Sequence, residues 1–198
     1  MIMQQLFNTL GFATLILCLG LIASPAMAHT AGEHQADPTH SEVDDDADFE
    51  TVVRGIDTLP NLQALTERWP DAEQRLIDLA IDEERSEFIR WRATSLLGNF
   101  QSDAVQSTLV DLTGTEERRV RSMAYTLLAG AFLERGDDDL FEIVESGLSD
   151  NSEQVRHNIV RALGHSDHPG ARSLLEELAS SHDDPQVQRL ATRSLERQ

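Results

Sequence analysis

Three stretches of the sequence share one pattern: EERSEFIRWRATSLLG at residues 83–98, EERRVRSMAYTLLAG at 116–130 and DNSEQVRHNIVRALG at 150–164. In each stretch an apolar residue, here called the anchor, precedes an arginine, and further apolar residues follow four and eight positions later. Residues at this spacing lie on one face of an α-helix. A fourth copy begins at Val187, where Gln188 replaces the arginine. The anchors and the residues that follow them are Ile89, Ala93 and Leu97; Val120, Ala124 and Leu128; Val155, Ile159 and Leu163; and Val187, Ala191 and Leu195.

The pattern recurs at a nearly constant period. The four anchors lie 31, 35 and 32 residues apart, and a second apolar stripe follows each of the first three. Two helices per period, joined by short connectors, predict helical hairpins that stack on one another. We expect the longest period to contain an added helical turn, because its stripe continues in phase to Phe132 and ends at Gly136. The second stripes are Ala104, Val105, Leu109 and Leu112; Leu140, Ile143, Val144 and Leu148; and Ala171, Leu174, Leu175 and Leu178.

The motif D/E-x(2-4)-V/I-R-x(2)-A/I-x(3)-L-G in these stretches resembles the HEAT-like repeat family, including the short bacterial repeats also found in phycobilin lyases. The resemblance covers residues 71–198. It implies an all-α fold, an αα-superhelix (HEAT/armadillo-type solenoid) of about four helical hairpins plus a C-terminal capping helix. The domain would span residues 51–198, and its first, degenerate hairpin would use residues 61–69 and 71–80.

The resemblance also implies a role for the arginine that follows each anchor. In such repeats this arginine pairs with carboxylates of the turn or of the adjacent unit, and an anion-binding site built from the same arginines is the alternative interpretation. Gly98 and Gly164 suit the position where a helix ends in the left-handed conformation. The predicted structural ladder comprises Arg90, Arg121 and Arg156, with acids such as Glu84, Glu117 and Asp150.

The first 28 residues predict an export signal. Residues 1–28 contain no charged side chain, and the run LGFATLILCLGLIA at 10–23 is apolar enough for the core of a secretory signal. Pro25 breaks a helix, and Ala26 and Ala28 are small enough for signal peptidase, so we expect cleavage after Ala28. The protein would then be periplasmic or secreted, with no membrane span after cleavage. An uncleaved membrane anchor is the alternative, although the run is short for a span of about 20 residues.

Residues 29–50, HTAGEHQADPTHSEVDDDADFE, are rich in acids and contain no arginine. The segment has few apolar groups, and their burial cannot offset an ordering entropy of about 1 to 2 kcal/mol per residue. We therefore expect a disordered acidic leader. Its histidines, His29, His34 and His40, are a candidate site for Zn or Cu. The other interpretation is a solvated linker, because the spacing of these histidines imposes no geometry.

Charge and composition exclude several classes of function. The chain has Lys+Arg 16, every one an arginine, against Asp+Glu 35, for a net charge of -19. Nucleic acids and anionic membranes are therefore poor partners, because binding them requires surface cations. Cys18 is the single cysteine, which leaves no thiol nucleophile or disulfide framework in the body of the chain. No catalytic motif is present, and we interpret His165 and His168 as polar loop residues, so we expect neither enzyme activity nor a cofactor.

The second helices carry acids outside their apolar stripes, here called the acidic face. In HEAT-like stacks these helices line the concave side, where such a face would attract a basic segment of a partner protein. A solvated surface that keeps the protein soluble is the other interpretation. We expect an exported protein-interaction or scaffold module, and the alternative is an accessory enzyme or a cofactor- or metal-handling chaperone of the periplasm. The acidic face consists of Asp111, Glu142, Glu145, Glu176 and Glu177.

Overall fold

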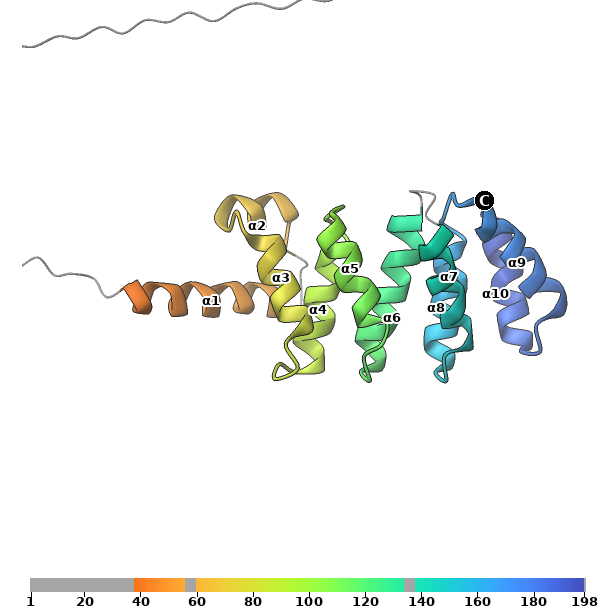
Figure 1. Ribbon diagram of the computed structural model, residues 1–198, viewed down its shortest axis with the longest axis horizontal. Helices are drawn as coiled ribbons and strands as arrows, with labels where there is room; N and C mark the ends of the chain where they lie inside the picture. Colours follow the sequence, from red (N-terminus) through yellow and green to blue (C-terminus); the bar gives the residue numbers. More distant parts are fainter. Residues whose placement is uncertain (1–37, 56–59, 134–137, 198) are drawn as a thin grey trace, which may run out of the picture. The chain divides into compact units, whose positions relative to one another are not determined.

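Helices form over every repeated stretch in the computed structural model, which describes residues 38–55, 60–133 and 138–197 (Figure 1). Within these ranges the regular structure is helical, and no strand occurs. The first helices of the hairpins are α2 (Leu62–Arg68), α4 (Glu87–Leu97), α6 (Arg118–Leu127) and α8 (Glu153–Leu163), with α10 (Pro185–Leu195) after them. The second helices are α3 (Ala72–Ile81), α5 (Asp103–Leu112), α7 (Asp138–Ser146) and α9 (Pro169–Ser181).

Polar side chains determine where several helices begin. The hydroxyl of Ser102 accepts a hydrogen bond from the backbone N–H of Val105 at 3.1 Å. The carboxylate of Asp184 accepts one from the backbone N–H of Gln186 at 2.7 Å. Such caps satisfy N–H groups that the first helical turn leaves unpaired. The short polar residues in the connectors therefore give the hairpins defined starting points.

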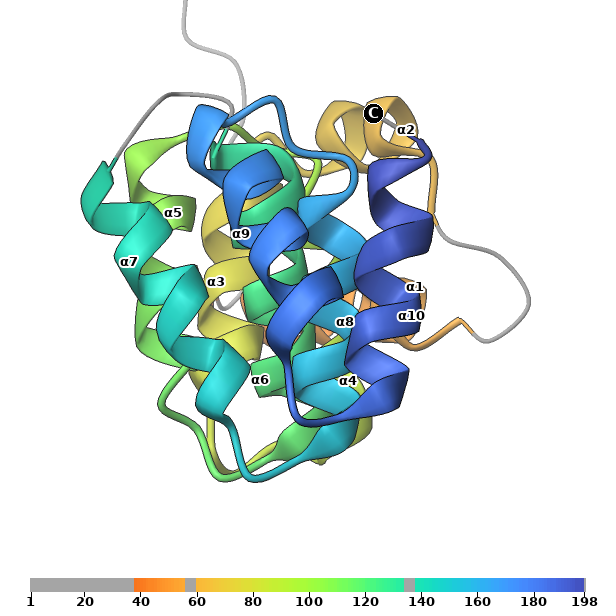
Figure 2. The same ribbon diagram turned by 90° about the vertical axis from the view of Figure 1, so that its right-hand side faces the viewer.

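The hairpins stack with the first helices in one row and the second helices on the other side (Figure 2). Helix α4 contacts α6, α6 contacts α8, and α8 contacts α10. The four anchors are at most 1% exposed, and the second-stripe residues are buried or half-buried except for Ala104. The predicted all-α solenoid of helical hairpins, with α10 as its last helix, is confirmed.

Gly98 and Gly164 end their helices, but not in the left-handed conformation that we expected. Their φ angles are -59° and -68°, which any residue can adopt. The neighbouring first helix approaches both glycines closely, and at Gly164 the contact includes backbone that cannot move aside. A Cβ on Gly164 would lie 2.6 Å from the Cβ of Ser194, and a Cβ on Gly98 would lie 2.5 Å from Cδ2 of Leu127. The predicted left-handed conformation is therefore wrong. The local motif suggested a conformational reason for glycine, because it does not reveal how closely the next hairpin approaches.

The longest period is accommodated at the end of its first helix. After α6 the chain continues as η1, a π-helical segment (Leu128–Phe132), and the side chain of Phe132 is fully buried. The π geometry adds a residue to the turn. The apolar stripe therefore extends to Phe132 as expected, but through a π-helical rather than an α-helical turn. Gly136, the expected end of this stripe, lies outside the described residues.

The acidic N-terminal segment contains a helix where the sequence predicted disorder. Helix α1 (Pro38–Arg54) packs against α4, with Phe49 and Val53 buried. The ring of Phe49 meets the ring of Trp69 edge-on, with 5.1 Å between the centroids. The predicted disordered leader over residues 29–50 is therefore wrong from residue 38 onward, and its boundary falls inside α1.

Arginines from later in the chain explain this difference. Arg75 of α3 lies 2.8 Å from the carboxylate of Asp45 and 2.6 Å from that of Asp46. Arg92 of α4 is buried and donates a hydrogen bond to the carbonyl of Val53, at the end of α1, at 3.1 Å. The composition of the leader shows only an excess of acids. The partners that neutralise them belong to other repeats.

Residues 1–37 lie outside the described residues, and the predicted signal segment and its cleavage site lie within them. In the part of the chain that the structure describes, no helix is both long enough and apolar enough to cross a membrane.

The close contact at Gly164 yields a first prediction. Gly164→Ala should lower the free energy of unfolding by about 1 to 3 kcal/mol, the usual cost of overpacking a core. Its new methyl group would also lie 3.1 Å from the backbone Cα of Ser194, which cannot rotate away. Urea unfolding followed by circular dichroism measures the change.

Gly130→Ala is the matched control. A Cβ on Gly130, within η1, would meet no atom within 4 Å. Alanine is favoured over glycine in a helix by about 0.5 to 1 kcal/mol, so this variant should be as stable as the wild type or slightly more so. Equal destabilisation by the two substitutions would contradict the proposed role of the close contact.

Candidate functional site

The side chain that follows each anchor reaches back to a carbonyl in the turn before its own helix or, for Arg90, in the last turn of α3. Arg90 donates from Nε to the carbonyl of Ala80 at 2.9 Å. In the next three repeats the accepting carbonyl lies six residues upstream, so Gln188 makes the same bond as the arginines it replaces. These bonds join Arg121 to Thr115 (2.6 Å), Arg156 to Asp150 (2.6 Å) and Gln188 to His182 (2.8 Å).

Two of the ladder arginines also pair with a carboxylate of the next repeat. Arg90 Nη1 lies 2.8 Å from Oε2 of Glu117, and Arg121 Nε lies 2.7 Å from Oδ2 of Asp150. Arg156 forms no such ion pair among the described residues. Glu84, the third acid expected in the ladder, pairs with none of these arginines. Each of the two ion pairs therefore joins consecutive hairpins.

The Arg121–Asp150 pair is the better enclosed of the two, since both side chains are largely buried. Burial alone would raise the pKa of Asp150. Hydrogen bonds from Arg121 and from the backbone N–H of Ser152 outweigh burial and hold the pKa of Asp150 below its ordinary value. The ionised carboxylate therefore contributes to the stability of the folded state.

The histidines of the third repeat serve mainly structural roles. His168 is buried, its Nδ1 accepts a hydrogen bond from the backbone N–H of Gly170, and its ring stacks on Phe141 at 4.7 Å. His168 is therefore a polar residue of the loop before α9, as expected, but it is buried and caps that helix. His157 is also buried, with Nε2 3.6 Å from a carboxylate oxygen of Asp184.

The candidate metal ligands of the leader cannot be placed. His29 and His34 lie outside the described residues, and His40 lies in α1 with a side chain that is not described. Among the residues that are described, no three side chains of His, Cys, Asp or Glu gather closely enough to hold a metal ion.

The acidic face lies on three consecutive second helices. Its residues are exposed on α5, α7 and α9. Glu176 forms an exposed ion pair with Arg172, with 3.1 Å between Nε and Oε1. The other four acids form no ion pair with any described residue. These residues are Asp111, Glu142, Glu145 and Glu177.

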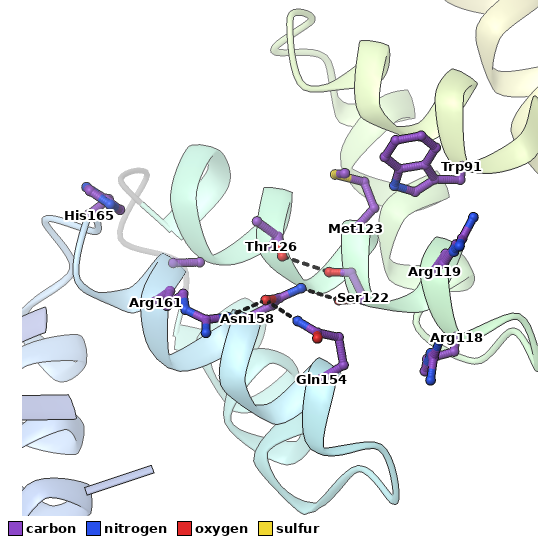
Figure 3. A pocket seen from close by; sticks show the side chains of 11 residues that line it. Trp91, Arg118, Arg119, Ser122, Met123, Thr126, Gln154, Asn158, Arg161 and His165 are labelled. Atoms are coloured by element: carbon purple, nitrogen blue, oxygen red, sulfur yellow. Dashed lines mark hydrogen bonds between the residues drawn. The ribbon is translucent and has the colours of Figure 1, made fainter. Parts of the chain in front are cut away.

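A groove on the row of first helices was not predicted from the sequence. It crosses α4, α6 and α8 and has a volume of about 720 Å³ (Figure 3). We call it the first-helix groove. It combines apolar side chains with arginines and uncharged polar groups. Its lining residues are Trp91, Arg118, Arg119, Ser122, Met123, Thr126, Gln154, Asn158, Arg161, Ala162 and His165.

Asn158 organises the polar part of this groove. Its amide nitrogen donates to the hydroxyl of Ser122 at 2.8 Å, which links α8 to α6. Its amide oxygen accepts hydrogen bonds from Gln154 Nε2 and from Arg161 Nη1, both at 2.8 Å (Figure 3). Arg161 is thereby oriented by a neutral partner, and it forms no ion pair with the described residues.

The residues at the outward positions of the first helices could have indicated this groove from the sequence. Trp91 packs against the hydrophobic core and is half-buried in the groove wall. Arg161 lies six residues after the anchor Val155, and Arg193 occupies the same position after Val187. Comparing outward residues between repeats would have placed these arginines in one row, whereas an analysis of apolar stripes alone does not.

A comparison with protein-family models agrees with the repeat architecture. Residues 120–196 match the family model described as HEAT repeats. No curated protein matches the chain. One similar solved structure is the crystal structure of an engineered protein, with 18% sequence identity over 83% of this chain and 75% of that chain and a TM-score of 0.46.

The ladder leads to a second prediction. Arg121→Ala should lower the free energy of unfolding by about 1.5 to 3 kcal/mol, the range for a hydrogen bond to a charged group, because it leaves Asp150 largely buried without its cation. Urea unfolding at pH 7 measures the loss. Arg172→Ala removes an exposed pair instead and should cost under about 0.5 kcal/mol. A wild-type midpoint for Arg121→Ala would show that the pair does not join the repeats.

A third prediction concerns pH. The pKa of Asp150 is lower in the folded state, so its stabilisation is complete above the unfolded-state pKa, near the ordinary value of 3.8, and is lost as pH falls through the folded-state pKa. The stability difference between wild type and Asp150→Asn should therefore be constant at neutral pH and shrink below that value. Urea titrations at several pH values measure it. A difference that grows on acidification would contradict the assignment.

Proposed function

We propose that this HEAT-like repeat protein is an exported scaffold that binds a basic segment of a partner protein through the acidic face. HEAT repeats commonly mediate protein interactions. Stacked repeats also present extended surfaces built from equivalent positions of successive units. The function proposed for this chain uses that surface, with negative charge as its recognition chemistry.

The exposure of unpaired acids on three consecutive second helices is the observation that supports this proposal. Glu142 and Glu145 of α7 lie between Asp111 of α5 and Glu177 of α9 in the chain, and all four are exposed. Among the described residues none of the four has an arginine partner. A row of uncompensated carboxylates attracts a basic segment and aligns it during encounter.

The proposed location outside the cytoplasm rests on residues 1–28. This segment has an uncharged, apolar core followed by small residues at 26 and 28, which is typical of a secretory signal. The mature chain would begin at His29 and would contain no cysteine, since Cys18 lies in the removed segment. A scaffold of this kind would act in the periplasm or outside the cell.

Export gives a fourth prediction. N-terminal sequencing of the protein recovered from a periplasmic or culture fraction should begin at His29, because Ala28 is the expected cleavage position. Ala28→Phe places a bulky side chain at that position and should leave the precursor uncleaved. Recovery of wild-type protein in the membrane fraction with Met1 still attached would instead indicate an uncleaved anchor.

The acidic face gives a fifth prediction. A fluorescein-labelled eight-residue peptide rich in lysine should bind the protein, and binding should weaken as salt rises, because exposed charges are screened over about 10 Å at 0.1 M. Reversal of Glu142, Glu145 and Glu176 to Arg should reduce affinity at least about tenfold. Fluorescence anisotropy measures binding, and circular dichroism should show unchanged helicity.

The matched control reverses three acids outside the acidic face. Glu83, Glu116 and Asp183 lie in turns, are exposed, and form no side-chain ion pair with the described residues. Reversing them changes net charge by the same amount, and surface substitutions usually change stability by less than about 0.5 kcal/mol each. Equal loss of binding in both triple variants would mean that net charge alone attracts the peptide.

A further inference from the structure

The arginines of the first-helix groove differ from the described arginines that pair with carboxylates, such as Arg75 and Arg121. Arg118, Arg119 and Arg161 are exposed and form no ion pair with the described residues. By contrast, the guanidinium of Arg75 contacts three carboxylates. In a chain with Asp+Glu 35 against Lys+Arg 16, carboxylates are plentiful. The groove is therefore a local region of positive charge on an acidic protein.

Among the described residues, the neighbouring acids form no ion pair with these arginines. Glu87 accepts a hydrogen bond from the backbone N–H of Arg119 at 3.2 Å and does not pair with a groove guanidinium. Glu153, in the first turn of α8, lies beside the groove and forms no ion pair with Arg118. Arg161 donates to the neutral Asn158, which leaves its other N–H groups for a ligand.

Apolar side chains lie between these charges. Trp91 and Met123 are half-buried in the groove wall, and Ala162 is buried beside Arg161. A segment with both carboxylates and apolar side chains matches this lining better than a small inorganic anion does. Arginine suits such a ligand because its planar guanidinium binds carboxylates in a two-pronged manner and stacks on aromatic rings.

The size of the groove favours an extended peptide. Packed helices lie about 8 to 10 Å apart, so a groove across three first helices is about 20 Å long. An extended chain rises about 3.3 Å per residue, and about six residues would fill that length. A nucleic acid extends far beyond such a groove and would meet the field of a protein whose net charge is -19.

We propose that the first-helix groove binds an extended acidic segment of a partner protein, with Arg118, Arg119 and Arg161 contacting its carboxylates and Trp91 and Met123 contacting its apolar side chains. The row of positive charge continues onto α10, where Arg189 and Arg193 are also exposed and have no ion pair with the described residues. This surface lies on other helices than the acidic face and does not depend on it.

The test uses a fluorescein-labelled eight-residue peptide of glutamates with two leucines, and the full mature chain. Fluorescence anisotropy should show saturable binding that weakens with salt. The triple variant Arg118→Gln, Arg119→Gln and Arg161→Gln should bind at least about tenfold more weakly, because each exposed ion pair adds a few-fold to affinity. The peptide with Gln in place of Glu should not bind.

The matched control is Arg54→Gln, Arg68→Gln and Arg172→Gln. These three side chains are 54% to 62% exposed, lie outside the groove, and their loss changes net charge equally. This variant should bind the acidic peptide with wild-type affinity. Trp91 supplies a local readout: peptide binding should change tryptophan fluorescence in the wild type and not in Trp91→Phe.

Reversal of the acidic face at Glu142, Glu145 and Glu176 should leave acidic-peptide binding intact, so failure of the two proposals can be distinguished. Equal loss in the groove and control variants would overturn the groove assignment. So would binding of a single-stranded oligonucleotide in place of the peptide. Self-association that disappears in the groove variant, without peptide binding, would identify a second copy of the chain as the occupant and overturn the proposal.

Discussion

Burial of the anchors depends on contact between consecutive first helices. Val120, Val155 and Val187 are buried because each first helix packs against the next, and no hairpin can cover this stripe by itself. The contact must be close, which accounts for the glycine at the end of α8. Gly164 leaves room for Ser194, whose hydroxyl donates a hydrogen bond to the carbonyl of Val160 at 3.0 Å. The ladder arginines bind to the turns that connect these first helices to the rest of the stack. Apolar packing and ion pairing therefore both stabilise the row of first helices.

This constraint also explains both ends of the stack. At one end α10 packs on α8 and α9 and turns Arg189 and Arg193 outward, so its outer surface is polar. At the other end α4 would present an uncovered apolar surface, and α1 packs against it with Phe49 and Val53 buried. An acidic sequence is an effective cover because its outer side stays soluble while Asp45 and Asp46 meet Arg75 of α3.

The local periodicity of the sequence predicted the structural features that depend on a single helix. The anchors and second stripes follow from spacing within ten residues, and the structure has helices there. Features that depend on distant residues were missed: α1 needs Arg75 and Arg92, and the role of Gly164 needs Ser194. The first-helix groove needs side chains from three repeats. Its residues alternate with the stripe residues, so no single segment of the sequence resembles a site.

The repeat architecture separates the two kinds of charge. Arg118, Arg119 and Arg161 lie at outward positions of the first helices, and the acidic face lies on α5, α7 and α9, with the buried stripes between them. The separation is not complete, since Arg172 lies on α9 and Glu87 and Glu153 lie on first helices. The two rows of helices are about 8 to 10 Å apart at their axes, and their outward side chains lie farther apart than that. At physiological salt the screening length is about 8 Å. The acids on one side therefore do not cancel the positive charge of the groove, although the net charge of the chain is -19.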